Sequence, residues 1–134
     1  MPHSEIDDCT LPWTFQENSI DYVHLRYLVG SIMDWSTLFK EAYRCTKPGG
    51  YIECFEGGGE FKCQDTSTKE HTAMDQWGEF FAAGGEKIGR SFRVLQNKTL
   101  EHGIEDAGFV DIHVENIQVG SDATYVSRWI SHTN

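Results

Sequence analysis

Between residues 19 and 56, the order of hydrophobic and polar positions predicts a strand, a helix and a second strand. A nearly continuous apolar run, Ser19–Val29, is typical of a parallel strand that is covered on both faces. Asp34 then stands where the N-cap of a helix is expected. The apolar residues that follow recur at offsets 0, 3, 4, 7 and 8, the spacing of one helix face: Trp35, Leu38, Phe39, Ala42 and Tyr43.

The segment Lys47–Gly50 predicts a tight return from this helix to the next strand. Pro48 cannot continue a helix, and Gly49 and Gly50 allow the backbone to reverse. The segment Tyr51–Phe55 then has the character of a strand. A strand, a helix and a strand joined by so short a return predict a right-handed crossover in a parallel sheet.

A second helix is predicted further along the chain. Ser67–Glu70 has the spacing of a capping box and would open it, and Gly84 and Gly85 would end it. Its aromatic residues stand at helical spacing. They are interpreted as the core face of a covering helix or, alternatively, as a lid over an apolar substrate: Trp77, Phe80 and Phe81.

A third helix and a further strand follow. The helix is predicted over Asn97–Ala107, with Gly108 as its left-handed C-cap and an apolar residue directly after the cap. Alternation over Val110–Val119 predicts a strand with a bulge near Asn116. The tail after Gly120 is polar and favours no single element.

Composition limits the classes of protein that need to be considered. The 134 residues suit a single domain, and a 13% aromatic share favours an ordered core. The formal net charge of −10 argues against nucleic acid or an anionic membrane as a partner, since both favour a positive protein face. No apolar run reaches the roughly 20 residues of a membrane span. The first residues lack signal-peptide character, so a cytoplasmic or nuclear protein is expected.

The cysteines predict reduced, packed thiols and no metal site. Cys9, Cys45, Cys54 and Cys63 include no Cys-x-x-Cys pair and stand among apolar neighbours. A zinc site from Cys54, Cys63 and His71 can be drawn, but this spacing fits no recurrent ligand pattern.

Four segments, taken in order, resemble the class I S-adenosylmethionine-dependent methyltransferases, most closely their fungal secondary-metabolism branch. The segments are D-D-C-T-L-P-W-T-F at residues 7–15, S-I-D-Y-V-H-L-R-Y-L at 19–28, L-F-K-E-A-Y-R-C-T-K-P-G-G-Y-I-E at 38–53 and I-E-D-A-G-F-V-D-I at 104–112. The resemblance implies an α/β, Rossmann-like fold with a mostly parallel sheet and flanking helices. Residues 1–134 are then expected to form a single C-terminal part of such a domain.

The resemblance also implies a set of cofactor contacts. An acidic residue near the adenine maps to Asp7 and Asp8, where a carboxylate would accept a hydrogen bond from the exocyclic amine. Cys9 follows as a backbone and packing contact. The end of the first strand lies beneath the methionine portion, which adds His24, Leu25 and Arg26. Open α/β sheets bind ligands at the carboxyl ends of their strands, which gives this mapping a physical basis.

Three acidic or imidazole side chains are candidate proton acceptors, and His24 and Glu56 are taken as the catalytic candidates. His24 could accept a proton from a methyl acceptor, because its ordinary pKa lies near neutrality, although a packed strand histidine is the simpler reading. Glu56, like Glu53, could act as a general base or could be an acid leaving a strand into solvent. Arg26 could pair with the carboxylate of the cofactor or with that of Asp34.

The sequence departs from the family pattern at the cofactor loop. Relatives carry a Gly-x-Gly-x-Gly loop and an acidic residue for the ribose hydroxyls, and the 134 residues contain no such loop. We therefore expect the chain alone to bind S-adenosylmethionine weakly or not at all. The expected function, at least in the ancestor of this chain, is transfer of a methyl group to a small molecule. The alternative is a non-catalytic scaffold or regulator whose exposed strand pairs with an identical chain or with a complementing N-terminal half.

Overall fold

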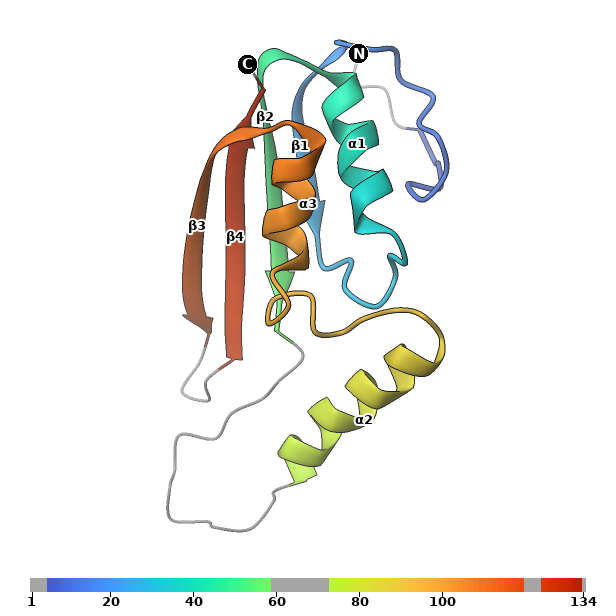
Figure 1. Ribbon diagram of the computed structural model, residues 1–134, viewed down its shortest axis with the longest axis vertical. Helices are drawn as coiled ribbons and strands as arrows, with labels where there is room; N and C mark the ends of the chain where they lie inside the picture. Colours follow the sequence, from blue (N-terminus) through green and yellow to red (C-terminus); the bar gives the residue numbers. More distant parts are fainter. Residues whose placement is uncertain (1–4, 59–72, 120–123, 134) are drawn as a thin grey trace.

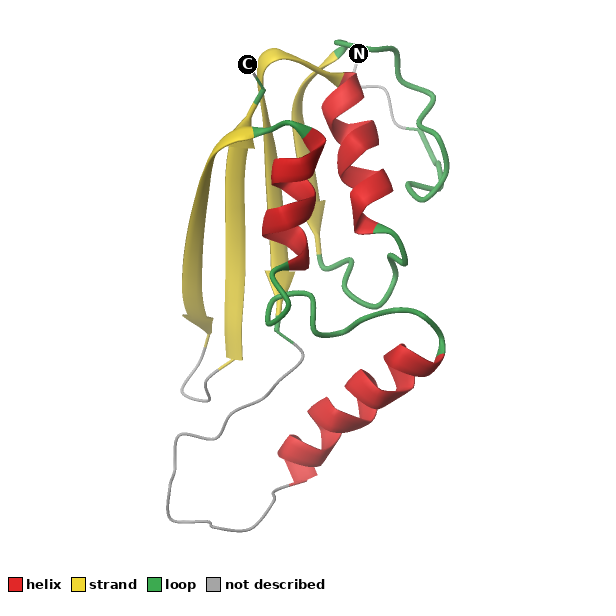
Figure 2. Ribbon diagram, in the orientation of Figure 1, coloured by secondary structure: helices red, strands yellow, loops and turns green. Residues whose placement is uncertain are grey.

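The computed structural model describes residues 5–58, 73–119 and 124–133, and within them it contains four strands and three helices (Figure 1). The elements in chain order are β1 (Ile20–Arg26), α1 (Trp35–Cys45), β2 (Thr46–Gly57), α2 (Ala73–Lys87), α3 (Thr99–Ala107), β3 (Val110–Val119) and β4 (Thr124–His132). The strands form one sheet in the order β1-β2-β4-β3 (Figure 2).

The strand directions confirm the predicted α/β, Rossmann-like class. β1 and β2 run parallel, with His24 opposite Glu53 and Arg26 opposite Phe55, and α1 connects them. β4 is antiparallel to both of its neighbours, β2 and β3. Three of the four described strands therefore run in one direction and β4 alone is reversed, so the sheet is mixed.

The polar tail forms a central strand, which the sequence pattern does not reveal. β4 lies between β2 and β3, with Ile130 opposite both Glu53 and His113. Backbone hydrogen bonds to two neighbours hold the segment in the sheet, and these bonds do not depend on an apolar pattern in the tail.

Two helices cover one face of this sheet. α1 and α3 lie side by side in front of the strands (Figure 1). They meet closely at Gly103 of α3, which lies against the ring of Phe39. The buried apolar residues at this interface come from the sheet, both helices and the segments beside them: Val23, Leu25, Ile32, Trp35, Leu38, Phe39, Ala42, Ile52, Cys54, Val94, Leu100, Ile104 and Phe109.

The predicted coverage of the first strand on both faces is wrong for the residues that the structure describes. Val23 and Leu25 are buried under the helices. His24 and Arg26, which alternate with them along the strand, are exposed. Tyr22 on the same outer face is 52% exposed, and its neighbour Tyr51 is 50% exposed. The reason is that both covering helices lie on one side. β1 also forms an edge of the described sheet, because β2 is its one strand partner there.

The local signals at the helix ends and at the return are confirmed. The Asp34 carboxylate accepts hydrogen bonds from the amide of Thr37 at 3.0 Å and from its hydroxyl at 2.6 Å. At the return, Gly49 has a φ of +78°. A Cβ on Gly50 would lie 2.9 Å from the carbonyl oxygen of Asp21, so this close approach of two strands requires glycine.

The end of α3 also follows the prediction. Gly108 adopts a left-handed conformation with a φ of +109°, and its amide donates to the carbonyl of Glu105. The amide of Phe109 donates to the carbonyl of Ile104, which completes the expected ending. The Phe109 ring is buried and packs edge-on against Tyr43, with 5.1 Å between the ring centroids.

The predictions for α2 are corrected in two respects. The helix continues through both glycines to Lys87 instead of ending at Gly84 and Gly85. Trp77 and Phe80 are 57% and 73% exposed, so they are not a core face in the described part of the chain. Phe81 is the aromatic residue that packs inward, against Phe92. α2 lies beyond the end of the sheet at which β1 and β2 finish, so it has no sheet face to cover (Figure 1).

Two further sequence predictions can be compared with the structure, the bulge in β3 and the lack of a membrane span, whereas others fall outside the described residues. The irregularity in β3 lies between Val110 and His113, not near Asn116, and Asp111 there has a φ of +53°. The predicted capping box Ser67–Glu70 falls outside the described residues. Cys63 and His71 do so as well. None of the described helices combines the length and the apolar character needed to cross a bilayer.

Candidate functional site

A pocket of about 310 Å³ runs along the edge of β1 that has no strand partner in the described part of the chain, and we call it the edge groove. Consecutive residues of a strand point to opposite faces, so a pocket that touches each of Tyr22 to Leu25 must lie along the strand edge. The N-terminal segment forms its other wall. The lining residues are Glu5, Asp7, Cys9, Trp13, Phe15, Ile20, Tyr22, Val23, His24 and Leu25.

The edge groove contains four of the six residues predicted to contact the cofactor. Asp7, Cys9, His24 and Leu25 line it, although the first two stand far from the last two in sequence. Asp8 and Arg26 are not among the lining residues. The grouping arises because residues 5–15 fold back beside β1.

A pair of charged residues on α1 holds the N-terminal segment in this position. The Glu41 carboxylate accepts a hydrogen bond from the Trp13 amide at 2.9 Å. Arg44 donates to the carbonyls of Trp13 and Phe15, each at 3.1 Å, and to the Glu41 carboxylate at 2.8 Å. The guanidinium of Arg44 lowers the pKa of Glu41. The sequence does not reveal the role of Glu41, because a Glu–Arg pair on a helix surface gives no sign that the carboxylate also binds the backbone of the N-terminal segment.

The two acidic candidates have different surroundings. The Asp8 carboxylate accepts hydrogen bonds from the amide and hydroxyl of Thr10 at 2.9 and 2.7 Å, which lowers its pKa and closes a turn. Asp7 accepts from the Asp8 amide at 2.8 Å through one oxygen and lines the groove. Asp7 is therefore the better-placed of the two to accept a hydrogen bond from a ligand.

Cys9 and Trp13 form the inner part of the same wall. The Trp13 indole N–H donates to the carbonyl of Cys9 at 3.1 Å. Burial raises the pKa of the Cys9 thiol, with a smaller contribution from the negative charge of Asp8. The thiol is thus held in its protonated form, and this suits a packing contact better than a nucleophile.

His24 belongs to a small polar cluster on the open face of the sheet. Its Nδ1 lies 2.9 Å from an Oε of Glu53 on β2, and the Tyr22 hydroxyl donates to the same carboxylate. The side chain of His24 is 44% exposed. A carboxylate that holds one ring nitrogen of a histidine leaves the other, Nε2, available for a proton.

Glu56 lies on the opposite face of the sheet and is fully buried. Its carboxylate accepts hydrogen bonds from the amide of Leu28 at 2.8 and 3.0 Å and from that of Val29 at 3.2 Å. Burial raises its pKa, and these backbone hydrogen bonds act in the opposite direction. The geometry points to a carboxylate that holds the loop after β1 in place, at the carboxyl end of the two parallel strands.

Arg26 packs against aromatic rings on the open face. Its guanidinium carbon lies 5.1 Å from the ring centre of Tyr27 and 5.8 Å from that of Phe55. The carboxylate of Asp34 is engaged at the start of α1, so the two residues do not form the ion pair that the sequence suggested. No cluster of three or more metal-binding side chains occurs among the described residues.

Comparison with known proteins shows the family. Residues 4–114 match the methyltransferase domain family. The secondary metabolism regulator laeA of Aspergillus niger is 32% identical over 105 residues, which is 78% of this chain and 28% of the regulator. The methyltransferase pytC of Aspergillus terreus is 30% identical over 118 residues, 87% of this chain and 36% of that enzyme. The chain thus spans about a third of the length of these relatives.

Solved structures share the fold. A phosphoethanolamine N-methyltransferase of Haemonchus contortus, solved with phosphomonomethylethanolamine and S-adenosylhomocysteine, aligns with a TM-score of 0.56 at 20% identity. The alignment covers 90% of this chain and 35% of that one. A methyltransferase of Mesorhizobium loti aligns with a TM-score of 0.61 at 14% identity, over 96% of this chain and 68% of its own.

The family match, the fungal relatives and the sheet with one reversed strand agree with one another. S-adenosyl-L-methionine is the cofactor of the family. The chain therefore belongs to the class I S-adenosylmethionine-dependent methyltransferases, in their fungal secondary-metabolism branch.

Proposed function

We propose that the edge groove is one wall of the S-adenosylmethionine pocket of a methyltransferase that acts on a small molecule. The observation that carries the proposal is the grouping of Asp7, Cys9, His24 and Leu25 along this edge of β1. S-adenosylmethionine, when bound, supplies a methyl group on a sulfonium, which is already a good leaving group. Methyl transfer then depends mainly on holding the acceptor in line, which requires few catalytic side chains.

The residues of the groove suit different parts of this task. The Asp7 carboxylate would accept a hydrogen bond from the adenine amine, and Leu25 would offer an apolar surface. His24 would accept a proton from the methyl acceptor at Nε2, because Glu53 holds its Nδ1. We assign Glu56 a positioning role, through its hold on the loop after β1, in place of the direct catalytic role expected from sequence.

A second segment is needed to complete this pocket, because the 134 residues contain no Gly-x-Gly-x-Gly loop. The edge of β1 offers a place for it. The backbone amide of Tyr27 donates to the carbonyl of Phe55 on β2. Backbone groups alternate in direction along a strand, so those of His24 and Arg26 point away from β2. A strand from an N-terminal half, on the same polypeptide or a separate one, would pair there, as could a second copy of this chain.

Calorimetry with S-adenosylhomocysteine tests the proposal. We expect no micromolar binding by the 134-residue chain alone. We expect binding when it is mixed with the N-terminal half of the methyltransferase domain of the Aspergillus niger relative. In the mixture, Asp7→Asn should weaken binding about tenfold, and the matched change Asp8→Asn should leave it unchanged. Micromolar binding by the chain alone would refute the two-segment pocket, and equal effects of the two variants would refute the role of Asp7.

A non-catalytic regulatory role is the second candidate, because several relatives carry the name secondary metabolism regulator. The chain would then act as a scaffold through the same strand edge, in the cytoplasm or the nucleus. Light scattering after size-exclusion chromatography measures the oligomeric state and so tests this scaffold role. A dimer supports pairing of two identical β1 edges, and a monomer argues against it. Methyl transfer by the assembled halves would favour the catalytic role.

A further inference from the structure

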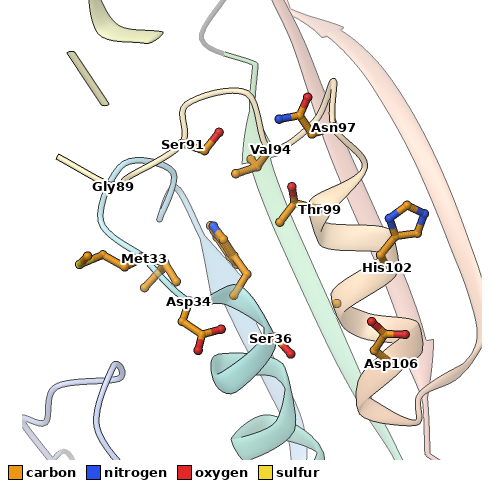
Figure 3. Close-up of a pocket in the computed structure, with 13 residues that line it drawn as sticks. Met33, Asp34, Ser36, Gly89, Ser91, Val94, Asn97, Thr99, His102 and Asp106 are labelled. Carbon is orange, nitrogen blue, oxygen red and sulfur yellow. The ribbon is translucent and has the colours of Figure 1, made fainter. Parts of the chain in front are cut away.

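A second pocket, of about 450 Å³, lies on the helix-covered side of the sheet, and we call it the interhelix pocket (Figure 3). Its volume falls in the range of small-molecule sites. It shares no lining residue with the edge groove. The lining comes from the start of α1, the connection between α2 and α3, and α3 itself: Ile32, Met33, Asp34, Trp35, Ser36, Gly89, Ser91, Val94, Asn97, Thr99, His102, Gly103 and Asp106.

A buried donor in the wall of this pocket lacks an acceptor. Trp35 is 4% exposed, and its indole N–H has no hydrogen-bond partner among the described residues. The ring stacks on Phe39, with 5.7 Å between the centroids, so the indole cannot turn freely to find an acceptor elsewhere. Buried N–H groups are almost always paired in proteins, and an unpaired one marks a place where an acceptor is to be expected.

The charges of the lining restrict the chemistry of that acceptor. No Lys or Arg is among the described residues that line the pocket, and its one basic side chain, His102, stands against two carboxylates, so the lining favours a cation over an anion. Asp34, the N-cap of α1, and Asp106 on α3 lie on opposite sides of the pocket (Figure 3). The Asp34 carboxylate already accepts from Thr37, whereas Asp106 stands on the exposed surface of α3, where it can meet a cation.

We propose that the interhelix pocket binds a small organic amine that also carries a hydrogen-bond acceptor. The ammonium group pairs with the Asp106 carboxylate, and the acceptor oxygen receives the indole N–H of Trp35. The apolar body of the ligand lies against Ile32, Met33 and Val94. This site does not depend on the proposed cofactor pocket, because the two pockets are formed by different residues.

Nuclear magnetic resonance on the 134-residue chain tests the proposal with two probes of one skeleton. Tyramine carries an ammonium group and a phenol oxygen, and 3-(4-hydroxyphenyl)propionate replaces the ammonium group by a carboxylate. Each is titrated to about 10 mM, since compounds of this size bind in the millimolar range. Tyramine should shift the assigned indole N–H resonance of Trp35 and slow its exchange with water, and the propionate should do neither.

Two substitutions on α3 complete the test. Asp106→Asn should weaken tyramine binding about fivefold, as expected for loss of a partly exposed ion pair. Glu105→Gln changes the neighbouring side chain, which does not line the pocket, and should leave binding unchanged. An unmoved Trp35 resonance, equal affinity for the two probes, or equal effects of the two substitutions would each overturn the proposal.

Discussion

Replacing Gly103 by alanine should destabilise the protein, because α3 approaches α1 at this residue without room for a side chain. A Cβ there would lie 2.7 Å from Cδ2 and 3.0 Å from Cε2 of Phe39. The Phe39 ring is fully buried, so it cannot move aside into solvent. Overpacking of this kind costs about 1–3 kcal/mol, and the higher helix propensity of alanine returns about 1 kcal/mol. We therefore expect a net loss of about 1 kcal/mol in the free energy of unfolding.

Thermal unfolding followed by circular dichroism measures this loss. A change of about 1 kcal/mol corresponds to a decrease in Tm of roughly 3–5 °C for a domain of this size. Gly84→Ala is the matched control, because Gly84 also lies inside a helix but a Cβ there would meet nothing within 4 Å. That variant should keep or raise the Tm. A Gly103→Ala protein that melts at or above the temperature of the parent would refute the close contact with Phe39.

Two further predictions concern the carboxylates that hold the site in place. Glu41→Ala removes the acceptor of the Trp13 amide, so hydrogen exchange at that amide should become about tenfold faster. Glu79→Ala is the control, because it removes an exposed ion pair with Arg93 and should leave the exchange rate of the Trp13 amide unchanged. Burial raises the pKa of Glu56 above 4.5, so the folded state binds this proton more tightly than the unfolded state. Its contribution to stability is thus present below pH 4.5 and is lost as the pH rises through the folded-state pKa. Glu56→Gln should remove this part of the pH dependence in urea unfolding between about pH 4 and 8, and parallel curves for the two proteins would contradict the assignment.

The residues that form the edge groove were partly predictable from the sequence. Asp7, Cys9, His24 and Leu25 could be proposed because a family resemblance connects them, not because their spacing does. The anchoring of the groove wall by Glu41 could not be predicted, since its partner Trp13 stands 28 residues away. The role of Glu56 could not be predicted either. In the sequence it stands where an acidic residue at the end of a strand would face solvent, but its side chain lies on the buried face and binds the loop after β1.

The sequence by itself determined the features that depend on neighbours a few residues apart. The cap at Asp34, the helical spacing of the apolar residues of α1, the positive φ at Gly49 and the left-handed ending at Gly108 each follow from interactions within one or two turns. Such features rest on local sterics and on hydrogen bonds to nearby backbone groups, which every chain with these residues must satisfy.

Only the tertiary structure decided which face of β1 is covered, where the tail joins the sheet and which carboxylates are buried. The alternation of Val23, His24 and Leu25 becomes an inside and an outside only once α1 and α3 settle on the same face. β4 pairs with β3, its neighbour in the sequence, and reaches its central place through backbone hydrogen bonds to β2, which is far away in the sequence. These outcomes depend on long-range pairing and on burial, because the free energy of a side chain is set by what surrounds it and not by its neighbours along the chain.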